Sequence, residues 1–337
     1  MQKKNPAKRR PERLVVTLLS LLFLSTAVFA TVKYVFRAPE LDTDKPVVTP
    51  DGTASADVDR TDTDEPDAPG RTRRKYCYNI LVSGLDDDNG GSDTNILVRF
   101  DVPNKRIDLV SLPRDTLLHN DYRNNKLNFA YAKGGTELLM EQIENLLGIP
   151  VDFYVTVNLK GFIALVDQID GVDFDIPINM DYDDPYQDLH IHFTKGPRHL
   201  NGQEAMEVVR FRHNNDGTGY GTEDIGRIGT QQAFLKAVAK QLLQIGNVKN
   251  IPALVDIFYT YVKTDLTTGN LVWLGNEALN IGTENIHFAT LTGDGSGYYN
   301  KQSVYVLDAQ ATCDLVNEAL NPYNEALTLE DMDILVP

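Results

Sequence analysis

Cysteine is nearly absent from this 337-residue chain, which contains only Cys77 and Cys313. A framework of several disulfides is therefore excluded, and so is a structural zinc site of the CxxC type. The two cysteines lie near opposite ends of the main body of the sequence. They fit either one disulfide that closes a very long loop or two buried free thiols.

Basic residues are scarce outside the N-terminus. Residues 1–37 hold eight of the 32 Lys and Arg residues and one of the 48 acids, which leaves a formal net charge of −23 for the rest of the chain. Nucleic-acid binding depends on neutralising phosphates with Lys and Arg, so we expect no nucleic-acid partner. An anionic substrate would instead need a few clustered arginines or a metal ion.

A long hydrophobic run occurs once, near the N-terminus. Residues 14–30 are almost wholly apolar, and the stretch 14–36 is long enough to cross a hydrocarbon layer about 30 Å thick as a helix. The basic tail, residues 1–13, predicts a cytoplasmic N-terminus and an extracellular body held at the cell membrane. Because Val28-Phe29-Ala30 fits a signal-peptidase site, a cleaved signal peptide is the alternative, and it exports the body as well.

Residues 37–75 are predicted to form an acidic flexible linker. Between residues 38 and 70 there are five prolines, ten acids and two bases, with almost no large apolar side chains. This composition cannot offset the entropy lost on ordering. Nothing marks a boundary further along, so residues 76–337 are predicted to form one domain.

Short apolar runs alternate with helical patterns through this domain. Strands are predicted at residues 78–84, 96–102, 106–112, 152–158, 172–176 and 285–291. Helices are predicted at residues 135–147, 159–169, 203–209, 230–245, 270–281 and 303–320. The alternation is typical of an α/β protein with helices on both faces of a mixed central sheet.

Acidic residues lie where the first predicted strand ends and the second begins. Asp86 follows the first strand, and Ser92-Asp93-Thr94 leads into the next. Open α/β sheets assemble their sites at the ends of neighbouring strands. Two carboxylates there suit Mg²⁺, which completes its octahedron with water and phosphate oxygens. A solvated acidic turn is the simpler interpretation.

Arginines follow at two further points. Arg114 lies at the exit of the third predicted strand, where an ion pair with Asp115 is the simpler alternative. Arg210-Phe211-Arg212-His213 ends a predicted helix and precedes a Gly-rich loop. Arginine binds phosphate oxygens in a bidentate manner, which lysine cannot do.

The next polar group begins a helix. Asp224, Arg227 and Gln231 are three and four residues apart, so they share one helix face. Together with the preceding arginines and acids they predict a pyrophosphate-binding site. The apolar helix faces at residues 159–169 and 234–243 fit either a lipid groove or ordinary core packing.

In this order the motifs closely resemble those of the LytR-CpsA-Psr family of cell-wall glycopolymer ligases. The resemblance spans about residues 76–245, and the N-terminal span and exported body match as well. The matching segments are Ile80–Asp86, Ser92–Thr94, Ser111–Thr116, Asn125–Tyr131, Gly134–Gly135, Asp152–Val155, Gly161–Phe162, Leu200–Ala205, Arg210–Arg212 and the helix start with Asp224, Arg227 and Gln231.

The resemblance implies a three-layer α-β-α domain that binds a polyprenyl-pyrophosphate glycolipid in a hydrophobic groove beside a Mg²⁺ site, with Mn²⁺ as a substitute. It implies transfer of the glycopolymer (teichoic acid, capsular or another secondary wall polysaccharide) to peptidoglycan, with release of polyprenyl phosphate. The implied roles are metal ligands for Asp86 and Asp93, pyrophosphate binding for Arg114, Arg210, Arg212, Arg227 and Gln231, and catalysis for Arg114, Asp224 and Arg227.

Two departures and three alternatives accompany this resemblance. Thr230 stands where the family commonly has arginine, and the loop from Asp86 to Asp93 is short and unusually acidic. With water as the acceptor, the same site would be a lipid-pyrophosphate pyrophosphatase. Non-enzymatic alternatives are a lipid- or glycan-binding scaffold and a transcriptional attenuator. Separately, His190 and His192 alternate along a predicted strand, where they would bind a transition metal or simply face solvent.

Overall fold

The computed structural model describes residues 36–41, 71–85, 90–186, 188–221, 224–242 and 257–336. The predicted basic tail and the predicted span, apart from Phe36, lie outside these residues. Within the described ranges, no helix has both the length and the apolar character needed to cross a bilayer.

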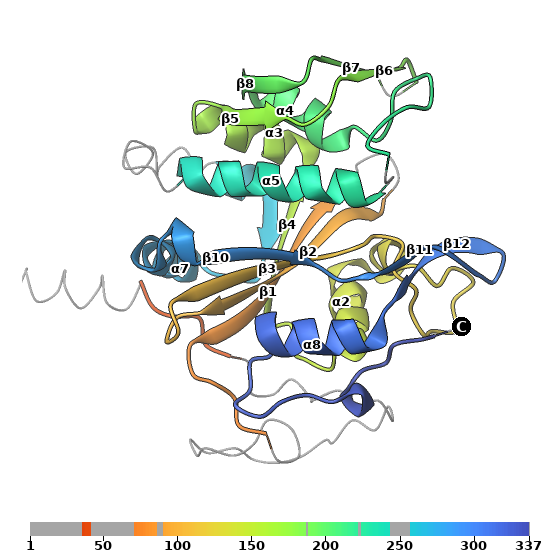
Figure 1. Cartoon of the computed structure of the whole chain (residues 1–337). Helices are drawn as coiled ribbons and strands as arrows, with labels where there is room; N and C mark the ends of the chain where they lie inside the picture. Colours follow the sequence, from red (N-terminus) through yellow and green to blue (C-terminus); the bar gives the residue numbers. More distant parts are fainter. Residues whose placement is uncertain are drawn as a thin grey trace, which may run out of the picture.

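A six-stranded mixed sheet forms the centre of the domain (Figure 1), with the strand order β10-β3-β2-β1-β4-β9. β1 runs parallel to β4 and β3 runs parallel to β10, whereas the other neighbours are antiparallel. The expected mixed sheet is therefore confirmed. Its strands are β1 (Cys77–Leu85), β2 (Ser92–Asp101), β3 (Arg106–Leu112), β4 (Phe153–Asn158), β9 (Val262–Thr264) and β10 (Ile286–Thr290).

Helices cover both faces of this sheet. Leu81 of the central strand faces a core formed with α2 (Leu127–Leu147) and α8 (Ala309–Ala319). Its neighbour Ile80 points to the opposite face and packs in a second core with α7 (Thr268–Ile281). Because successive side chains of a strand alternate between faces, a strand buried on both sides has the continuous apolar run that marks β1 in the sequence.

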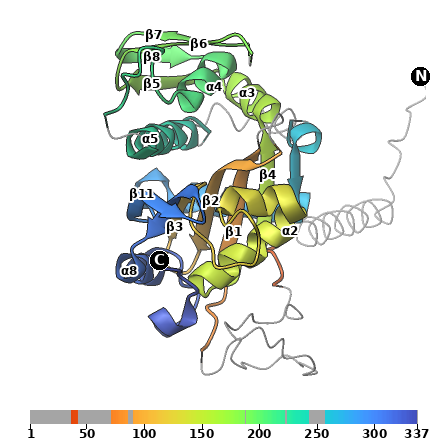
Figure 2. The same ribbon diagram turned by 90° about the vertical axis from the view of Figure 1, so that its right-hand side faces the viewer.

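A further unit with its own core lies beyond one end of the sheet (Figures 1 and 2). Phe234 is fully buried in it and contacts Phe162 and Phe174 at ring-centroid distances of 5.8 and 5.3 Å. The elements of this unit are α3 (Leu159–Gln168), α4 (Gly202–Arg210), α5 (Asp224–Leu242) and two hairpins, β5 (Val172–Ile176) with β8 (Gly196–Leu200) and β6 (Met180–Asp184) with β7 (Leu189–Phe193).

Most element predictions are confirmed, but the helix predicted at residues 303–320 is wrong in its first third. Strand β12 (Gln302–Leu307) occupies that part and pairs with β11 (Gly293–Tyr299). Helix α8 begins only after Asp308, whose side chain accepts a hydrogen bond from the Ala311 N–H at 3.0 Å and caps the helix. Short 3₁₀ turns are η2 (Thr283–Asn285) and η3 (Leu329–Asp331).

Two other helices begin ahead of the apolar patterns that predicted them. α2 starts at Leu127 and is interrupted at Gly134 and Gly135, where φ is −139° and 68°. The helix ends where predicted, at Leu147, because Gly148 has φ 66° and caps it by donating its N–H to the Glu144 carbonyl at 2.9 Å. α5 starts at Asp224, six residues before the apolar pattern at residues 230–245, which confirms the helix start inferred from the spacing of Asp224, Arg227 and Gln231.

The cysteines are two buried free thiols, the second of the two alternatives. Burial raises the pKa of Cys77 to about 11, so its thiol stays protonated at neutral pH.

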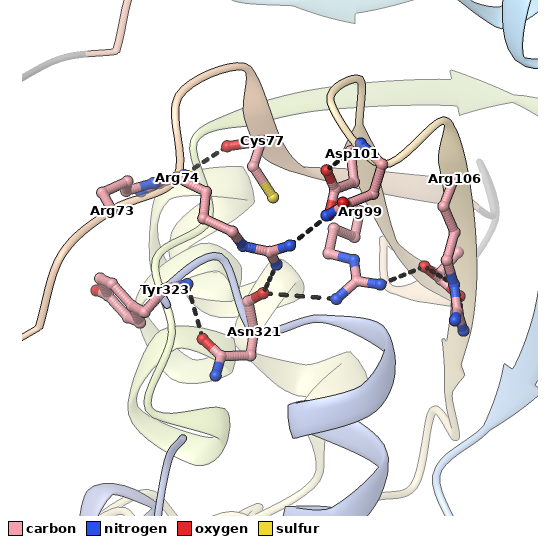
Figure 3. Close-up of polar contacts among 10 residues, drawn as sticks. Arg73, Arg74, Cys77, Arg99, Asp101, Arg106, Asn321 and Tyr323 are labelled. Carbon is pink, nitrogen blue, oxygen red and sulfur yellow. Dashed lines mark hydrogen bonds and ion pairs between the residues drawn. The ribbon is translucent and has the colours of Figure 1, made fainter. Parts of the chain in front are cut away.

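Buried ion pairs fill the end of the sheet where β1 begins (Figure 3). Arg99 donates to Asp108 at 2.7 Å, and Arg106 contacts the same carboxylate at 2.7 Å. Arg74 binds Asp101 at 2.5 Å and the carbonyl of Asn321. We call these residues, together with Arg73 and its partner Asp152, the base cluster.

Two segments far apart in the sequence meet at this same corner, residues 71–75 and residues 321–331. Arg71 pairs with Asp331 at 2.6 Å, and the Asn324 N–H donates to the Thr72 carbonyl at 3.0 Å. Arg73 forms an antiparallel bridge with Tyr323. Residues 71–75, at the end of the predicted linker, thus pack on the body as a strap along residues 321–331.

Candidate functional site

A cavity of about 380 Å³ lies where the sheet meets the unit formed by α3, α4 and α5. Gly84 and Leu85 line it from the carboxyl end of β1, and Asn158 lines it from the carboxyl end of β4. β1 and β4 are parallel neighbours, so their carboxyl ends meet at one edge of the sheet. The cavity therefore occupies the position where α/β sheets usually carry their sites.

Six of the predicted site residues line this one cavity. They come from the start of β2, the loop after β3, the end of α4 and the first turns of α5. These residues are Asp93, Arg114, Arg210, Arg212, Arg227 and Gln231. Asp86 lies outside the described residues, and Asp224 is the first residue of α5 but its side chain is not among those described.

Arg114, in the loop after β3, pairs with Asp93 at the start of β2. Its contact with Asp115, the simpler alternative, is longer at 3.6 Å, and Lys126 also reaches Asp115 at 3.3 Å. The Arg114 carbonyl accepts from the Asn128 N–H at 2.9 Å, which fixes the loop against the first turn of α2. The arginine is thus held at the cavity while part of its guanidinium stays accessible.

Two consecutive glutamines position α5. Gln231 donates to the Val209 carbonyl at 3.0 Å and so ties α5 to the last turn of α4, which carries Arg210. Gln232 donates to the Ala289 carbonyl at 2.7 Å and to Thr290 Oγ1 at 2.6 Å, at the end of β10. Sequence reasoning missed this role of Gln232, whose only signal was a polar side chain on a packed helix.

Thr230, which stands where the family commonly has arginine, uses its hydroxyl within its own helix. Its side chain is buried, and its hydroxyl donates to the Gly226 carbonyl one turn earlier at 3.1 Å. Nearby, burial raises the pKa of Tyr220, so that hydroxyl stays neutral. The cationic part of the site therefore comes from Arg114, Arg210, Arg212 and Arg227.

The cavity wall is divided between charge and apolar surface. Among the described lining residues, four arginines face one aspartate, so a dianionic phosphate group fits the charge balance. The predicted helix faces at residues 159–169 and 234–243 both contribute to the apolar wall. Its side chains are Val82, Leu85, Ile96, Val157, Leu159, Phe162, Leu189, Val209, Phe234 and Leu235.

Other lining residues were not predicted as site residues. Tyr182 and Leu189 come from the β6–β7 hairpin, and His213 follows Arg212 and contacts the Tyr182 ring edge-on at 5.7 Å. Asn158 both lines the cavity and caps α3 by accepting from the Gly161 N–H at 2.9 Å. An amphiphile with a chain on one side and phosphates on the other fits such a cavity.

The donor set fits a divalent cation with few protein ligands. Asp93 is the one carboxylate among the described lining residues, and its side chain is 39% exposed. Mg²⁺ typically takes one or two carboxylates and fills its other positions with water and phosphate oxygens. An ion bound at Asp93 would therefore rely on the phosphates of a ligand for part of its coordination.

Comparison with known proteins points to one family. Residues 48–321 match the LytR_cpsA_psr family. Among curated proteins, TagV of Bacillus subtilis, named a polyisoprenyl-teichoic acid–peptidoglycan teichoic acid transferase, is 30% identical over 249 residues, covering 71% of this chain and 62% of TagV. TagU of Bacillus cereus, which has the same functional name, is 32% identical over 244 residues, covering 71% of this chain and 76% of TagU.

Further similarities agree in fold. The crystal structure of B. subtilis TagV superposes with a TM-score of 0.61 at 28% identity, covering 78% of this chain and all of that one. The regulatory protein MsrR of Staphylococcus aureus is 31% identical over 214 residues, covering 61% of this chain and 62% of MsrR. The matched region thus spans less than two thirds of the length of TagV and of MsrR.

Proposed function

The chain belongs to the LytR-CpsA-Psr family, and on this premise we propose that it is a Mg²⁺-dependent phosphotransferase. In this proposal it moves a polyprenyl-pyrophosphate-linked glycopolymer onto peptidoglycan and releases polyprenyl phosphate. The observation that carries the proposal is the single cavity in which an arginine-rich wall adjoins an apolar wall. The transferase names of TagV and TagU support the same reaction class.

The donor binds with its two ends against the two walls. The polyprenyl chain lies along the apolar side chains contributed by α3 and α5, such as Phe162 and Leu235. The pyrophosphate lies against Arg114, Arg210, Arg212 and Arg227. Burial of the chain supplies affinity, while the guanidinium groups fix the phosphates by paired hydrogen bonds.

The reaction is a displacement at phosphorus. A peptidoglycan hydroxyl attacks the sugar-proximal phosphorus, the bridging P–O bond breaks, and polyprenyl phosphate leaves with the bonding electrons. Arg114 and Arg227 neutralise the negative charge that grows on the phosphate oxygens, which is the main demand of phosphoryl transfer. The hydroxyl proton passes to Asp224 or to solvent, and Asp224 also orients the arginines.

A divalent cation completes the charge balance. Asp93, and Asp86 by the family pattern, would hold Mg²⁺ or Mn²⁺, which supplies further neutralisation of phosphate oxygens when bound. Arg114 already contacts Asp93, so the cation-binding and phosphate-binding parts of the site are in direct contact.

The location proposed for this reaction is the outer side of the cell membrane. Residues 14–36 form the single-pass anchor, residues 1–13 stay in the cytoplasm and residues 37–75 link the anchor to the body. The apolar run and the preceding basic residues support this arrangement. The net charge of −23 outside residues 1–37 disfavours nucleic acid as a partner.

The decisive experiment follows both products of the reaction. The full-length chain in detergent is incubated with a polyprenyl-pyrophosphate oligosaccharide, peptidoglycan fragments and Mg²⁺. We expect polyprenyl monophosphate and a wall-linked oligosaccharide, both lost on chelation and in Arg114→Ala. Arg123→Ala is the matched control, because Arg123 is exposed and lies outside the cavity.

The other outcomes identify the alternatives. Lipid release without a linked product would replace the transferase by a pyrophosphatase. Tight donor binding without any release would replace it by a scaffold. Activity that survives chelation would remove the metal from the proposal.

A further inference from the structure

Two histidines and two aspartates gather on the outer face of the β6–β7 hairpin, away from the cavity. The strands pair so that Asp183 lies opposite His190 and Asp181 lies opposite His192. All four side chains are at least half exposed. Since side chains alternate along a strand, Tyr182, between the two aspartates, and Leu189, just before His190, point the other way and line the cavity.

The polar atoms of this cluster converge. One ligand atom each from Asp183, His190 and His192 lies within 4.8 Å of the other two. Asp183 Oδ1 is 2.5 Å from His190 Nδ1 and 3.3 Å from His192 Nε2. In a tetrahedral zinc site with bonds of about 2.0–2.1 Å, neighbouring ligand atoms are about 3.3 Å apart. Asp183 and His192 already have this spacing, whereas the 2.5 Å between Asp183 and His190 is a hydrogen-bond distance that has to lengthen for both to bind one ion.

A further contact orients one of the imidazoles. His192 Nδ1 is 2.8 Å from Asp181 Oδ1, while its Nε2 faces Asp183. Metal-bound histidines usually hydrogen-bond their second ring nitrogen to a carboxylate in this way, which fixes the ring orientation. Two imidazoles and a carboxylate favour Zn²⁺ or a similar transition ion over Mg²⁺, which prefers oxygen ligands.

We propose that Asp183, His190 and His192 form a Zn²⁺-type site, with Asp181 orienting His192, that braces one wall of the phosphate cavity from outside. The fourth position is left to water. This site is separate from the cation site at Asp93, and its existence does not depend on the proposed function.

The other edge of β6 is hydrogen-bonded to the segment that follows Arg212 and His213, which is why an ion on this hairpin would brace the cavity wall. The Asp181 N–H donates to Asn214 Oδ1 at 2.7 Å, and the Asp183 N–H donates to Asn215 Oδ1 at 2.6 Å. The Asn215 N–H returns a bond to the Asp181 carbonyl at 3.2 Å. These asparagines follow Arg212 and His213 of the cavity directly. An ion that clamps β6 to β7 therefore also restrains the segment that carries Arg212.

The same domain contains a natural control. In the β5–β8 hairpin, His199 Nδ1 lies 2.8 Å from Asp173 Oδ1, again across paired strands and again exposed. No second histidine completes this pair in the described part of the chain. His199→Ala removes one exposed His–Asp pair without touching the proposed site.

The test is zinc titration of the full-length chain, purified without a polyhistidine tag and held in millimolar Mg²⁺ to occupy the Asp93 site. Wild type and His199→Ala should bind one equivalent of Zn²⁺ by calorimetry. We expect His192→Ala to lose this binding and Asp181→Asn to weaken it by about 10–100-fold. These side chains are at least half exposed, so the variants should fold, and circular dichroism checks this.

Hydrogen exchange tests the bracing. Zinc should slow amide exchange at residues 211–219 in wild type and leave it unchanged in His192→Ala. Equal zinc binding by wild type and a His190→Ala/His192→Ala variant would overturn the site, and so would the absence of binding. Binding with unchanged exchange at residues 211–219 would overturn the bracing role.

Discussion

The two ends of the central sheet both carry arginines, but they use them differently. At the base, Arg99 and Arg106 share Asp108, and Arg74 has both Asp101 and a backbone carbonyl as partners (Figure 3). At the cavity, four arginines accompany a single aspartate among the described lining residues. The innermost pair of the base cluster is nearly closed to solvent, since the Arg99 and Asp108 side chains are 5% and 2% exposed, whereas Arg74 and Arg106, at 22% and 31%, are about as exposed as Arg114 at 26%.

The comparison distinguishes charged side chains that are paired inside the fold from charged side chains that face a cavity. Burial alone would lower the pKa of Arg73, but the Asp152 carboxylate outweighs it and raises that pKa, so the guanidinium stays charged with its partner inside the fold. A buried arginine that is already paired with a carboxylate of the same fold is not available to bind a ligand. The described side chains around the cavity include more cations than anions, and this excess stands out against a strongly acidic chain.

The largest expected effect comes from breaking the base cluster. Asp108→Ala leaves Arg99 buried without its carboxylate, and losing one partner of a buried pair typically costs about 3–5 kcal/mol in the free energy of unfolding. Urea denaturation measures this loss, while donor turnover per folded molecule should stay near wild type. Asp173→Ala, at an exposed carboxylate, should change the free energy of unfolding by no more than about 0.5 kcal/mol. A loss below about 1 kcal/mol in Asp108→Ala would show that the base cluster is not needed for stability.

At the cavity the same kind of change should affect rate and leave stability nearly intact. Arg114→Ala should lower polyprenyl phosphate release by about 10²–10³-fold, the usual effect of removing one group that neutralises transition-state charge. Arg114→Lys should recover only part of the rate, because lysine cannot make the bidentate contact. Stopped assays of lipid release measure both variants. Full activity in Arg114→Lys would mean that point charge alone is required.

Stabilisation by pyrophosphate should depend on the arginines at the cavity and not on the base cluster. Pyrophosphate at ten times its dissociation constant should raise the free energy of unfolding by about 1.4 kcal/mol, because it binds only the folded state. The increment should shrink in Arg212→Ala, whose side chain is exposed at the cavity, and persist in Asp173→Ala. Thermal or urea unfolding with and without pyrophosphate measures it. An unchanged increment in Arg212→Ala would exclude this arginine from phosphate binding.

The smallest effect concerns a pair outside both clusters. The hydrogen bond to Asp173 raises the pKa of His199, so the contribution of this pair to stability is complete below the unfolded-state pKa of about 6.5. It is lost as the pH rises through the higher folded-state pKa. The difference in melting temperature between wild type and His199→Gln should therefore be present at pH 6 and vanish at pH 8.5. A difference that grows with pH would contradict the pairing.

The sequence predicted the parts of the fold that have a strong period. β3 was predicted with its bounds, and the burial of β1 on both faces produced the apolar run that identified it. The site residues were recognisable as arginines and acids at the ends of strands and helices, where such charges do not contribute to core packing. Their order along the chain carried the family resemblance.

Other features left no local signal. β6 has the sequence Met-Asp-Tyr-Asp-Asp. Its three aspartates give the segment the composition of a polar loop, so it was not predicted as a strand. In residues 303–307 the adjacent Val304 and Tyr305 are both buried, so the strand shows no regular alternation, and its apolar content also suits the start of an amphipathic helix. Arg99 and Asp108 meet because β2 and β3 pair in one register, and only the fold determines that register.

The strap at residues 71–75 gives the domain a mechanical property. Arg71, Thr72 and Arg73 are all joined to the segment 321–331. Ahead of them, the Arg37 carbonyl accepts from Asn270 of α7 at 3.1 Å and the Pro39 carbonyl accepts from the Tyr78 hydroxyl of β1 at 3.0 Å, so the chain before the domain is attached to it at two places. The cavity lies at the far end of β1. Neither set of contacts includes a residue that lines the cavity, so a pull on the chain ahead of residue 71 acts on parts of the domain other than the arginines around the cavity.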